Sequence, residues 1–419
     1  MAVTKSDQTR IETLAADLDA AFGRQDDPSP LEIVRAPGRV NLIGDFMEFN
    51  EAFALPAAIG LETRLAYRRR SDGVVRVVSR QSSETGSFDI DSIPTGIPRD
   101  AAGRGRRHAR IDAADHATHA PAHAAAWTEH VVGAAWSLRE AGIGIGGFDG
   151  VVDTTLPVGG GLGSSAALEL ASTLALIGRG RVLSPAHLAS LAQRAERDYV
   201  GVDAGILDML AGAAGRADRA LLLDYRSLEV RPVAMPFGVE VVLCDTGERH
   251  GTPAKYRAEC ARAVALLAEK MPGLCSLRDL DAASLRRYRD VLPESVAARA
   301  EYVVSENARV VATAAALETG DLDELGRLFA ESHAALRDLY LTSSPAVEAM
   351  VDVVAAIPGV IGSRMMATGS GGYTVNLVLA DAVPAVQTAA AREYGARTGL
   401  RGRAFQVDLV DGAGSISPP

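Results

Sequence analysis

The sequence predicts an α/β protein, because strand-like apolar runs alternate with amphipathic helical segments along most of the chain. A helix is expected over residues 5–24, where Ile11, Leu14, Leu18 and Phe22 recur on one face. With 419 residues the chain is long enough for about two to three domains at roughly 150 residues each.

Further strands and helices follow along the chain, and turn residues separate them. Strands are predicted at residues 31–35, 150–155, 220–224, 239–245 and 373–379. Helices are predicted over residues 124–141, 184–199, 255–270 and much of 280–340. Residues 411–419 show no apolar pattern, and we expect a frayed tail there.

The overall charge and the cysteine content narrow the class of protein. The net charge of −10 argues against a nucleic-acid or anionic-membrane surface. The 3 cysteines (Cys244, Cys260 and Cys275) are widely spaced and form no C-x-x-C pair, which predicts reduced thiols in the cytoplasm and no structural zinc. We see no signal peptide and no apolar run of about 18 residues, so no membrane span is expected.

A glycine-rich stretch at residues 156–167 lies between a predicted strand and a predicted helix. Leu170, Leu174 and Ile177 follow it at helical spacing. Glycines let backbone N–H groups approach a ligand, and a helix N-terminus adds unpaired donors and partial positive charge. The stretch therefore predicts an anion site, most simply for phosphate. The alternative is a tight turn that caps a core helix through Ser164 or Ser165.

Two common phosphate loops do not fit this stretch. A Walker A loop ends in Gly-Lys-Ser/Thr, and the stretch contains no lysine. The dinucleotide fingerprint needs G-x-G-x-x-G, and residues 159–163 have a different spacing.

Ionisable residues interrupt apolar surroundings at three places. Residues 36–50 combine a strand with Arg39 and several acids, which suggests a cleft or a structural ion pair. Ser184 and Pro185 begin a helix whose apolar stripe is bordered by Glu196. Asp208 lies among apolar neighbours, so its carboxylate needs a cation or a chemical role.

Two other segments leave questions open. Residues 103–123 are rich in arginine and histidine; their spacing fits no metal template, so a solvated loop is expected and its role stays unassigned. Residues 363–372 form a second loop of small residues that leads into the strand at 373–379.

In these features the chain resembles the GHMP family of small-molecule kinases, and within it the galactokinase branch. Three ordered motifs carry the resemblance, at residues 37–44, 157–167 and 364–374. Further matches to the branch lie at residues 195–196, 205–208, 222–229, 249–250, 331–333 and 336–338. The resemblance spans roughly residues 10–410, and several ordered motifs agree.

The resemblance implies a fold and a reaction. The fold is an α/β (α+β) arrangement of two domains: a ribosomal-protein-S5-like domain over residues 1–215 and a GHMP ferredoxin-like domain over residues 216–419. The active site would lie between them. The reaction is transfer of phosphate from ATP, with Mg²⁺, to the anomeric hydroxyl of a sugar. The expected partners are ATP and a small sugar, without nucleic acid or membrane, and we expect a cytoplasmic monomer.

The resemblance also implies roles for single residues. Asp208 would be the base and Arg39 would hold it ionised and offset charge. Mg²⁺ would bind Ser165 and Glu196. The residues expected to contact ATP are Pro157, Gly159, Gly160, Gly161, Leu162, Gly163, Ser164, Ser165 and Ala166. The third loop would close the site through Gly369, Gly371 and Gly372. The residues expected at the sugar are Asp45, Phe46, Glu48, Gly205 and Asp208.

Departures from the branch cluster on sugar recognition. The branch reads Glu-His-Thr-Asp-Tyr-Asn where this chain reads Asp45-Phe46-Met47-Glu48-Phe49-Asn50. Met209 replaces a usual glutamine. The segment after His250 is short, so Tyr256 is not equated with the branch's sugar-contacting tyrosine. Ala367, Thr368 and Ser370 replace Gly, Gly and Phe.

These departures leave the acceptor sugar open. Phe46 replaces a histidine that lies near the sugar C6 hydroxyl, and it offers no hydrogen bond, which suggests a less polar group there. We expect a kinase of galactose or a galactose-like sugar. The alternatives are a kinase of a 6-deoxy or otherwise modified sugar, or a ligand sensor with little catalysis. A kinase of a non-sugar alcohol is disfavoured by the matches at 205–208 and 222–229.

Overall fold

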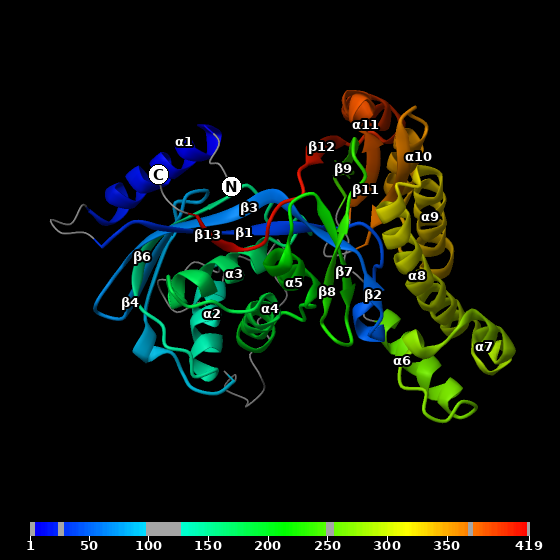
Figure 1. The fold of residues 1–419 in the computed structure, drawn as a ribbon, viewed down its shortest axis with the longest axis horizontal. Helices are drawn as coiled ribbons and strands as arrows, with labels where there is room; N and C mark the ends of the chain where they lie inside the picture. The colour runs from blue at the N-terminus through cyan, green and yellow to red at the C-terminus, as the bar shows by residue number, and fades with distance from the viewer. Residues whose placement is uncertain (1–4, 24–28, 98–126, 249–254, 368–371, 417–419) are drawn as a thin grey trace.

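The fold is taken from a computed structural model, which describes residues 5–23, 29–97, 127–248, 255–367 and 372–416. Its largest sheet has six strands in the order β13-β1-β3-β6-β4-β5 (Figure 1). All neighbouring strands are antiparallel except β4 and β6, which are parallel. The strands are β1 (Glu32–Asn41), β3 (Pro56–Arg69), β4 (Val74–Ser79), β5 (Thr85–Asp89), β6 (Phe148–Thr154) and β13 (Gly414–Ile416).

Helices cover both faces of this sheet (Figure 1). On one face lies α1 (Lys5–Phe22), whose buried Ile11, Leu14 and Leu18 pack against the strands as the sequence pattern predicts. On the other face, four helices pack on the sheet, and the largest apolar core fills the space between. These helices are α2 (Thr128–Glu140), α3 (Ser164–Ile177), α4 (Pro185–Arg194) and α5 (Leu207–Ala214). Ser184 caps α4 by accepting from the His187 N–H, so the predicted helix start is confirmed.

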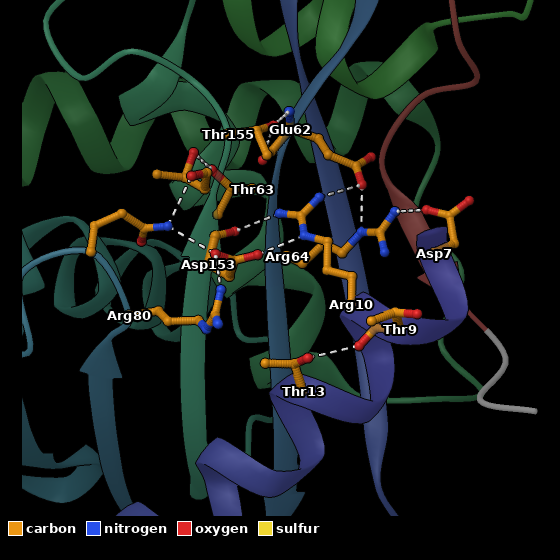
Figure 2. Close-up of polar contacts among 12 residues, drawn as sticks. Asp7, Thr9, Arg10, Thr13, Glu62, Thr63, Arg64, Arg80, Asp153 and Thr155 are labelled. Carbon is orange, nitrogen blue, oxygen red and sulfur yellow. Dashed lines mark hydrogen bonds and ion pairs between the residues drawn. The ribbon is translucent and has the colours of Figure 1, made fainter. Parts of the chain in front are cut away.

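A charged network also ties α1 to the sheet (Figure 2). Arg10 of α1 reaches Asp153 of β6 at 2.6 Å and Glu62 of β3 at 3.3 Å. Arg64 of β3 binds Glu62 at 2.5 Å and returns to Asp7 of α1 at 2.5 Å. Each buried carboxylate in this network therefore has arginine partners, which offset the cost of removing it from water.

Two smaller sheets complete the strand inventory. A three-stranded sheet has the order β2-β7-β8, with β2 (Phe53–Ala54), β7 (Arg219–Asp224) and β8 (Val230–Ala234). A four-stranded antiparallel sheet has the order β10-β11-β9-β12. Its strands are β9 (Val239–Asp245), β10 (Val360–Met366), β11 (Tyr373–Leu379) and β12 (Arg403–Val407). The strands predicted at 220–224, 239–245 and 373–379 are thus confirmed.

The remaining helices lie at the side of the molecule away from α1, and only some of them pack against the four-stranded sheet (Figure 1). They are α6 (Lys255–Ala268), α7 (Ala282–Arg287), α8 (Glu294–Thr319), α9 (Leu322–Ala335), α10 (Pro345–Ala355) and α11 (Val383–Thr398). Two π-helical turns follow α4 and α9, namely η3 (Ala195–Val200) and η6 (Leu336–Tyr340). Short 3₁₀ turns are η1 (Glu48–Asn50), η2 (Ile90–Ser92), η4 (Leu277–Asp279), η5 (Arg289–Val291) and η7 (Ala380–Ala382).

The end of the described chain differs from the sequence prediction. The expected frayed tail at 411–419 is wrong for β13, which pairs with β1 through Ile33↔Ile416. The strand predicted at 31–35 is also longer, because β1 continues to Asn41. The division at residues 215 and 216 stays a prediction, and β13 returns across it to the first sheet. None of the described helices is both long and apolar enough to cross a bilayer.

Candidate active site

The glycine stretch forms the predicted loop between β6 and α3. Gly159, Gly161 and Gly163 have φ values of 69°, 73° and 82°, which favour glycine. Gly163 is the N-cap of α3, and among the described residues no side chain caps that helix. The capping alternative for Ser164 and Ser165 is therefore wrong, while the order strand, loop, helix is confirmed. The free N–H groups of the first turn fit an anion.

Gly38 brings this loop against β1. A Cβ at Gly38 would lie 2.4 Å from Leu156 Cδ2 and 2.5 Å from the Leu162 carbonyl oxygen. The next residue, Arg39, donates its backbone N–H to that Leu162 oxygen at 3.0 Å. The strand register shifts between Pro37 and Gly38, as the close approach requires. The first and second sequence motifs thus meet in space.

Arg39 joins the loop to Asp208. Its guanidinium lies 2.8 Å from Asp208 Oδ1 and donates to the Gly161 carbonyl oxygen at 2.5 Å. Arg39 is 2% exposed, whereas the Asp208 side chain is 30% exposed. A Cβ on Gly163 would stand 3.4 Å from Asp208 Oδ2, so the carboxylate lies directly beside the loop. A buried cation thus holds a partly exposed carboxylate at the mouth of an anion site.

Glu48 lies close enough to Asp208 for their charges to interact. It accepts a hydrogen bond from the Ile206 N–H at 2.8 Å, and a Cβ on Gly205 would lie 1.9 Å from its Oε2. Burial raises the pKa of Glu48 above its ordinary value, and the Asp208 carboxylate raises it further, against the hydrogen bond from Ile206. The structure therefore brings together four predicted residues: Arg39, Glu48, Gly205 and Asp208.

Asp45 and Phe46 face the protein interior more than the sequence suggests. Asp45 accepts from Arg364 at 2.5 Å and from the Ala367 N–H at 3.1 Å, and the carboxylate and the guanidinium are both fully buried. Phe46 has a φ of 64°, and its ring stacks on Tyr340 with centroids 4.5 Å apart. Both residues hold the segment at 45–50 in place. Their direct contact with a sugar stays a prediction.

Tyr225 belongs to the site, but sequence reasoning gave it no role. Burial raises the pKa of the Tyr225 phenol well above its ordinary value, and the nearby carboxylates of Glu48 and Asp208 raise it further. The phenol is thus a neutral hydrogen-bonding group at the site near neutral pH. In the sequence, Tyr225 appears only as one of the eight residues in the match at 222–229. That match alone did not distinguish it from its neighbours.

Ser165 and Glu196 lie together, as a shared magnesium site requires. Their side chains are hydrogen-bonded. Burial raises the pKa of Glu196 to about 8, and the Glu169 carboxylate contributes to that shift. Among the described residues Glu196 has no arginine or lysine partner, and a bound cation stabilises such a buried carboxylate, so these residues fit Mg²⁺.

The third loop is described only in part. Gly372 has a φ of 85°, and its carbonyl oxygen accepts from the backbone and the hydroxyl of Thr246, each at 2.8 Å. Gly369 and Gly371 lie outside the described residues, as do Thr368 and Ser370, the match at 249–250 and the segment 103–123. Their predicted roles are untested.

Fold and site together have the form of a small-molecule kinase, with an anion loop facing a paired carboxylate. The GHMP kinases N terminal domain model matches residues 129–216, and the galactokinase galactose-binding signature matches residues 18–69. A galactokinase of Chloroflexus aggregans is 38% identical over 386 residues, covering 91% of this chain and 92% of that protein. A galactokinase of Roseiflexus sp. is 39% identical over 393 residues, covering 92% of this chain and 93% of that protein.

A solved structure gives the same result. The Lactococcus lactis galactokinase complexed with galactose superposes with a TM-score of 0.83 at 26% identity, covering 97% of this chain and all of that one. The chain belongs to the galactokinase family. The resemblance and the GHMP kinase fold expected from the sequence are confirmed, and so is the expectation of a sugar kinase.

Proposed function

We propose that the protein transfers the γ-phosphoryl group of ATP to the anomeric hydroxyl of galactose or a galactose-like sugar. The observation that carries this proposal is the Arg39–Asp208 pair, held 2.8 Å apart beside the glycine loop. Phosphoryl transfer depends mainly on positioning and charge stabilisation, and this arrangement supplies both. We also propose that the protein acts as a cytoplasmic monomer.

Asp208 is placed to act as the base. Its carboxylate is partly exposed at the end of α5 nearest the loop, where it can accept the proton of a sugar hydroxyl. Arg39 favours the ionised carboxylate and adds positive charge where the transferred group would carry negative charge. Its bond to the Gly161 carbonyl fixes the guanidinium before any substrate binds.

The loop from Pro157 to Ala166 would hold the nucleotide phosphates on its backbone N–H groups and on the α3 N-terminus. Ser165 and Glu196 would hold Mg²⁺, which supplies charge neutralisation on the phosphates when bound. The sugar would lie beside Asp208, with Glu48 and Tyr225 as its polar contacts. Gly205 leaves room for the Glu48 carboxylate.

A second acceptor is favoured by the position of Phe46. Its ring stacks on Tyr340 and meets the edge of Tyr256 with centroids 6.0 Å apart, so the Phe46 side chain offers a bound sugar an apolar surface and no hydrogen-bonding group. An unpaired sugar hydroxyl beside these rings would be disfavoured. A 6-deoxy sugar is therefore the second candidate acceptor.

A sugar panel with ATP and Mg²⁺ tests both candidates. ADP release gives the rates, and phosphorus NMR identifies the phosphorylated hydroxyl. We expect a 1-phosphate product from a galactose-like sugar. Asp208→Asn should lower kcat at least about 1000-fold and leave ATP binding intact. Full turnover in that variant would overturn the base assignment, and a preference for galactose over its 6-deoxy analogue would exclude the second acceptor.

The turnover assay, together with a binding measurement, separates a kinase from a ligand sensor. Binding of ATP and sugar without turnover in the wild type would favour the ligand sensor over the kinase. Isothermal titration with a non-hydrolysable ATP analogue supplies the binding measurement.

A further inference from the structure

Seven carboxylates are buried in the described part of the chain, and they differ in how their charge is balanced. They are Asp45, Glu62, Asp149, Asp153, Glu169, Glu196 and Glu306. Five of them form ion pairs with arginine, the partners being Arg364, Arg35, Arg76, Arg10 and Arg309 in order. Within the described ranges, Glu169 and Glu196 have neither an arginine nor a lysine partner.

These two carboxylates share one small space with a histidine. His130 of α2, Glu169 of α3 and Glu196 of η3 each offer a ligand atom, and the three atoms lie within 4.8 Å of one another. The His130 ring nitrogen Nδ1 is 2.8 Å from Glu169 Oε1. Three separate elements thus converge on one point, where a side chain from each can bind the same ion.

The packing around the cluster is close and leaves little access for bulk water. Gly133, one turn after His130, lets α2 approach η3: a Cβ there would lie 3.3 Å from the Ala195 carbonyl oxygen. Glu169 is 0% exposed, and the His130 side chain is 12% exposed. Glu196 lies in a π-helical turn, a feature frequently found at functional sites.

Glu169 gives the observation that points to a ligand. Its Oε2 atom is buried and has no hydrogen-bond partner among the described residues. Leaving a buried acceptor unpaired is costly, and leaving a buried carboxylate without a cation is more so. A cation placed between Glu169 and Glu196 satisfies both groups.

We propose that His130, Glu169 and Glu196 bind a divalent transition cation such as Mn²⁺, Co²⁺ or Zn²⁺. This site is separate from the nucleotide magnesium, which would use Ser165 and the other oxygen of Glu196. An imidazole nitrogen with two carboxylates suits these ions, whereas Mg²⁺ prefers oxygen ligands and keeps its water. Ligands about 2.0–2.2 Å from one ion lie at most about 4.4 Å apart. The three ligand atoms lie within 4.8 Å of one another, so a small side-chain movement brings them all within bonding distance of one ion.

The test is Mn²⁺ binding to chelator-treated protein without nucleotide, followed by electron paramagnetic resonance. We expect one tight Mn²⁺ per chain that excess Mg²⁺ does not displace. His130→Gln and Glu169→Gln should each weaken Mn²⁺ binding at least about tenfold. The matched control is His187→Gln at an exposed histidine, which should leave the affinity unchanged.

Ser165→Ala separates the two metal sites. Ser165 is hydrogen-bonded to Glu196 but offers no ligand atom to the cluster, so loss of its hydroxyl should weaken nucleotide-free Mn²⁺ binding less than His130→Gln does. Mn²⁺ binding that is lost in Ser165→Ala and unchanged in His130→Gln would overturn the proposal. The absence of Mn²⁺ binding to the wild type would also overturn it, since protons would then balance the two carboxylates.

One measurement needs no variant and guards against misfolding. Pulsed electron paramagnetic resonance of Mn²⁺ bound to the wild type should show a hyperfine coupling to a histidine nitrogen. That coupling should change when histidine is labelled with nitrogen-15. A spectrum without that coupling excludes His130 as a ligand and overturns the proposal. The sugar kinase activity can stand or fall independently, because nucleotide and sugar are absent from this experiment.

Discussion

Gly205→Ala should weaken sugar binding by displacing Glu48. A Cβ at residue 205 would lie 1.9 Å from Glu48 Oε2, 2.8 Å from its Cδ and 3.1 Å from Oε1. Contacts below 3.0 Å do not persist, so the carboxylate must move away. The movement breaks its 2.8 Å hydrogen bond with the Ile206 N–H.

The expected size follows from the hydrogen bond to the sugar that a displaced Glu48 would lose. A hydrogen bond to a charged group contributes about 1.5–3 kcal/mol, and about 1.4 kcal/mol corresponds to a tenfold change. If Glu48 contacts the sugar, Gly205→Ala should lower kcat/KM about 10- to 100-fold. KM for ATP should stay unchanged, because the atoms that a Cβ at residue 205 would meet most closely belong to Glu48 and not to the glycine loop.

A double-mutant cycle with steady-state kinetics checks the cause. In a Glu48→Ala background, Gly205→Ala should change kcat/KM less than about twofold, since the displaced carboxylate is already absent. An equal loss in both backgrounds would refute the reasoning and place the effect in the backbone. Gly144→Ala is the control, because a Cβ at that glycine meets nothing within 4 Å.

Three other variants test the core, the pH dependence and the acceptor. Arg364→Met leaves the fully buried Asp45 carboxylate without its cation and should lower the free energy of unfolding by about 3–5 kcal/mol in denaturant titrations; a loss below about 1 kcal/mol would contradict this. Burial raises the pKa of Glu196 to about 8 from an ordinary value near 4.5, so Glu196 should by itself lower metal-free stability as pH rises between these values, by at most about 5 kcal/mol. Glu196→Gln should flatten this slope in melts across that range, and an unchanged slope would refute the assignment. Phe46→His should shift the ratio of kcat/KM toward galactose over its 6-deoxy analogue about tenfold, and a constant ratio would separate Phe46 from sugar choice.

Local patterns predicted the conformation of the glycine loop well, whereas its binding of nucleotide stays a prediction. The glycines at 159, 161 and 163 adopt the positive φ values that a glycine loop implies, and α3 begins at Ser164. The cost of placing ionisable groups among apolar residues marked Arg39 and Asp208 separately, and only the family resemblance paired them. These predictions rest on short segments whose chemistry requires a particular conformation.

Contacts between distant segments were harder to predict. Asp45 was expected at the sugar, but its partner Arg364 lies more than 300 residues away in β10, and no local pattern links them. The cluster of His130 with Glu169 and Glu196 forms only where α2, α3 and η3 converge. The pairing of β1 with β13 is another contact between distant segments, and no pattern in residues 411–419 predicts it.

That last pairing has a consequence for synthesis of the protein. β1 leaves the ribosome early, and β13 is among the last described segments to follow. Until then the edge of β1 from Ile33 to Arg35 lacks its neighbouring strand. The same strand carries Arg39 of the candidate site, so an error in its pairing would also affect that site. Open strand edges recruit incorrect partners while a chain is incomplete. The first sheet is therefore exposed to misassembly until β13 has been synthesised and has paired with β1.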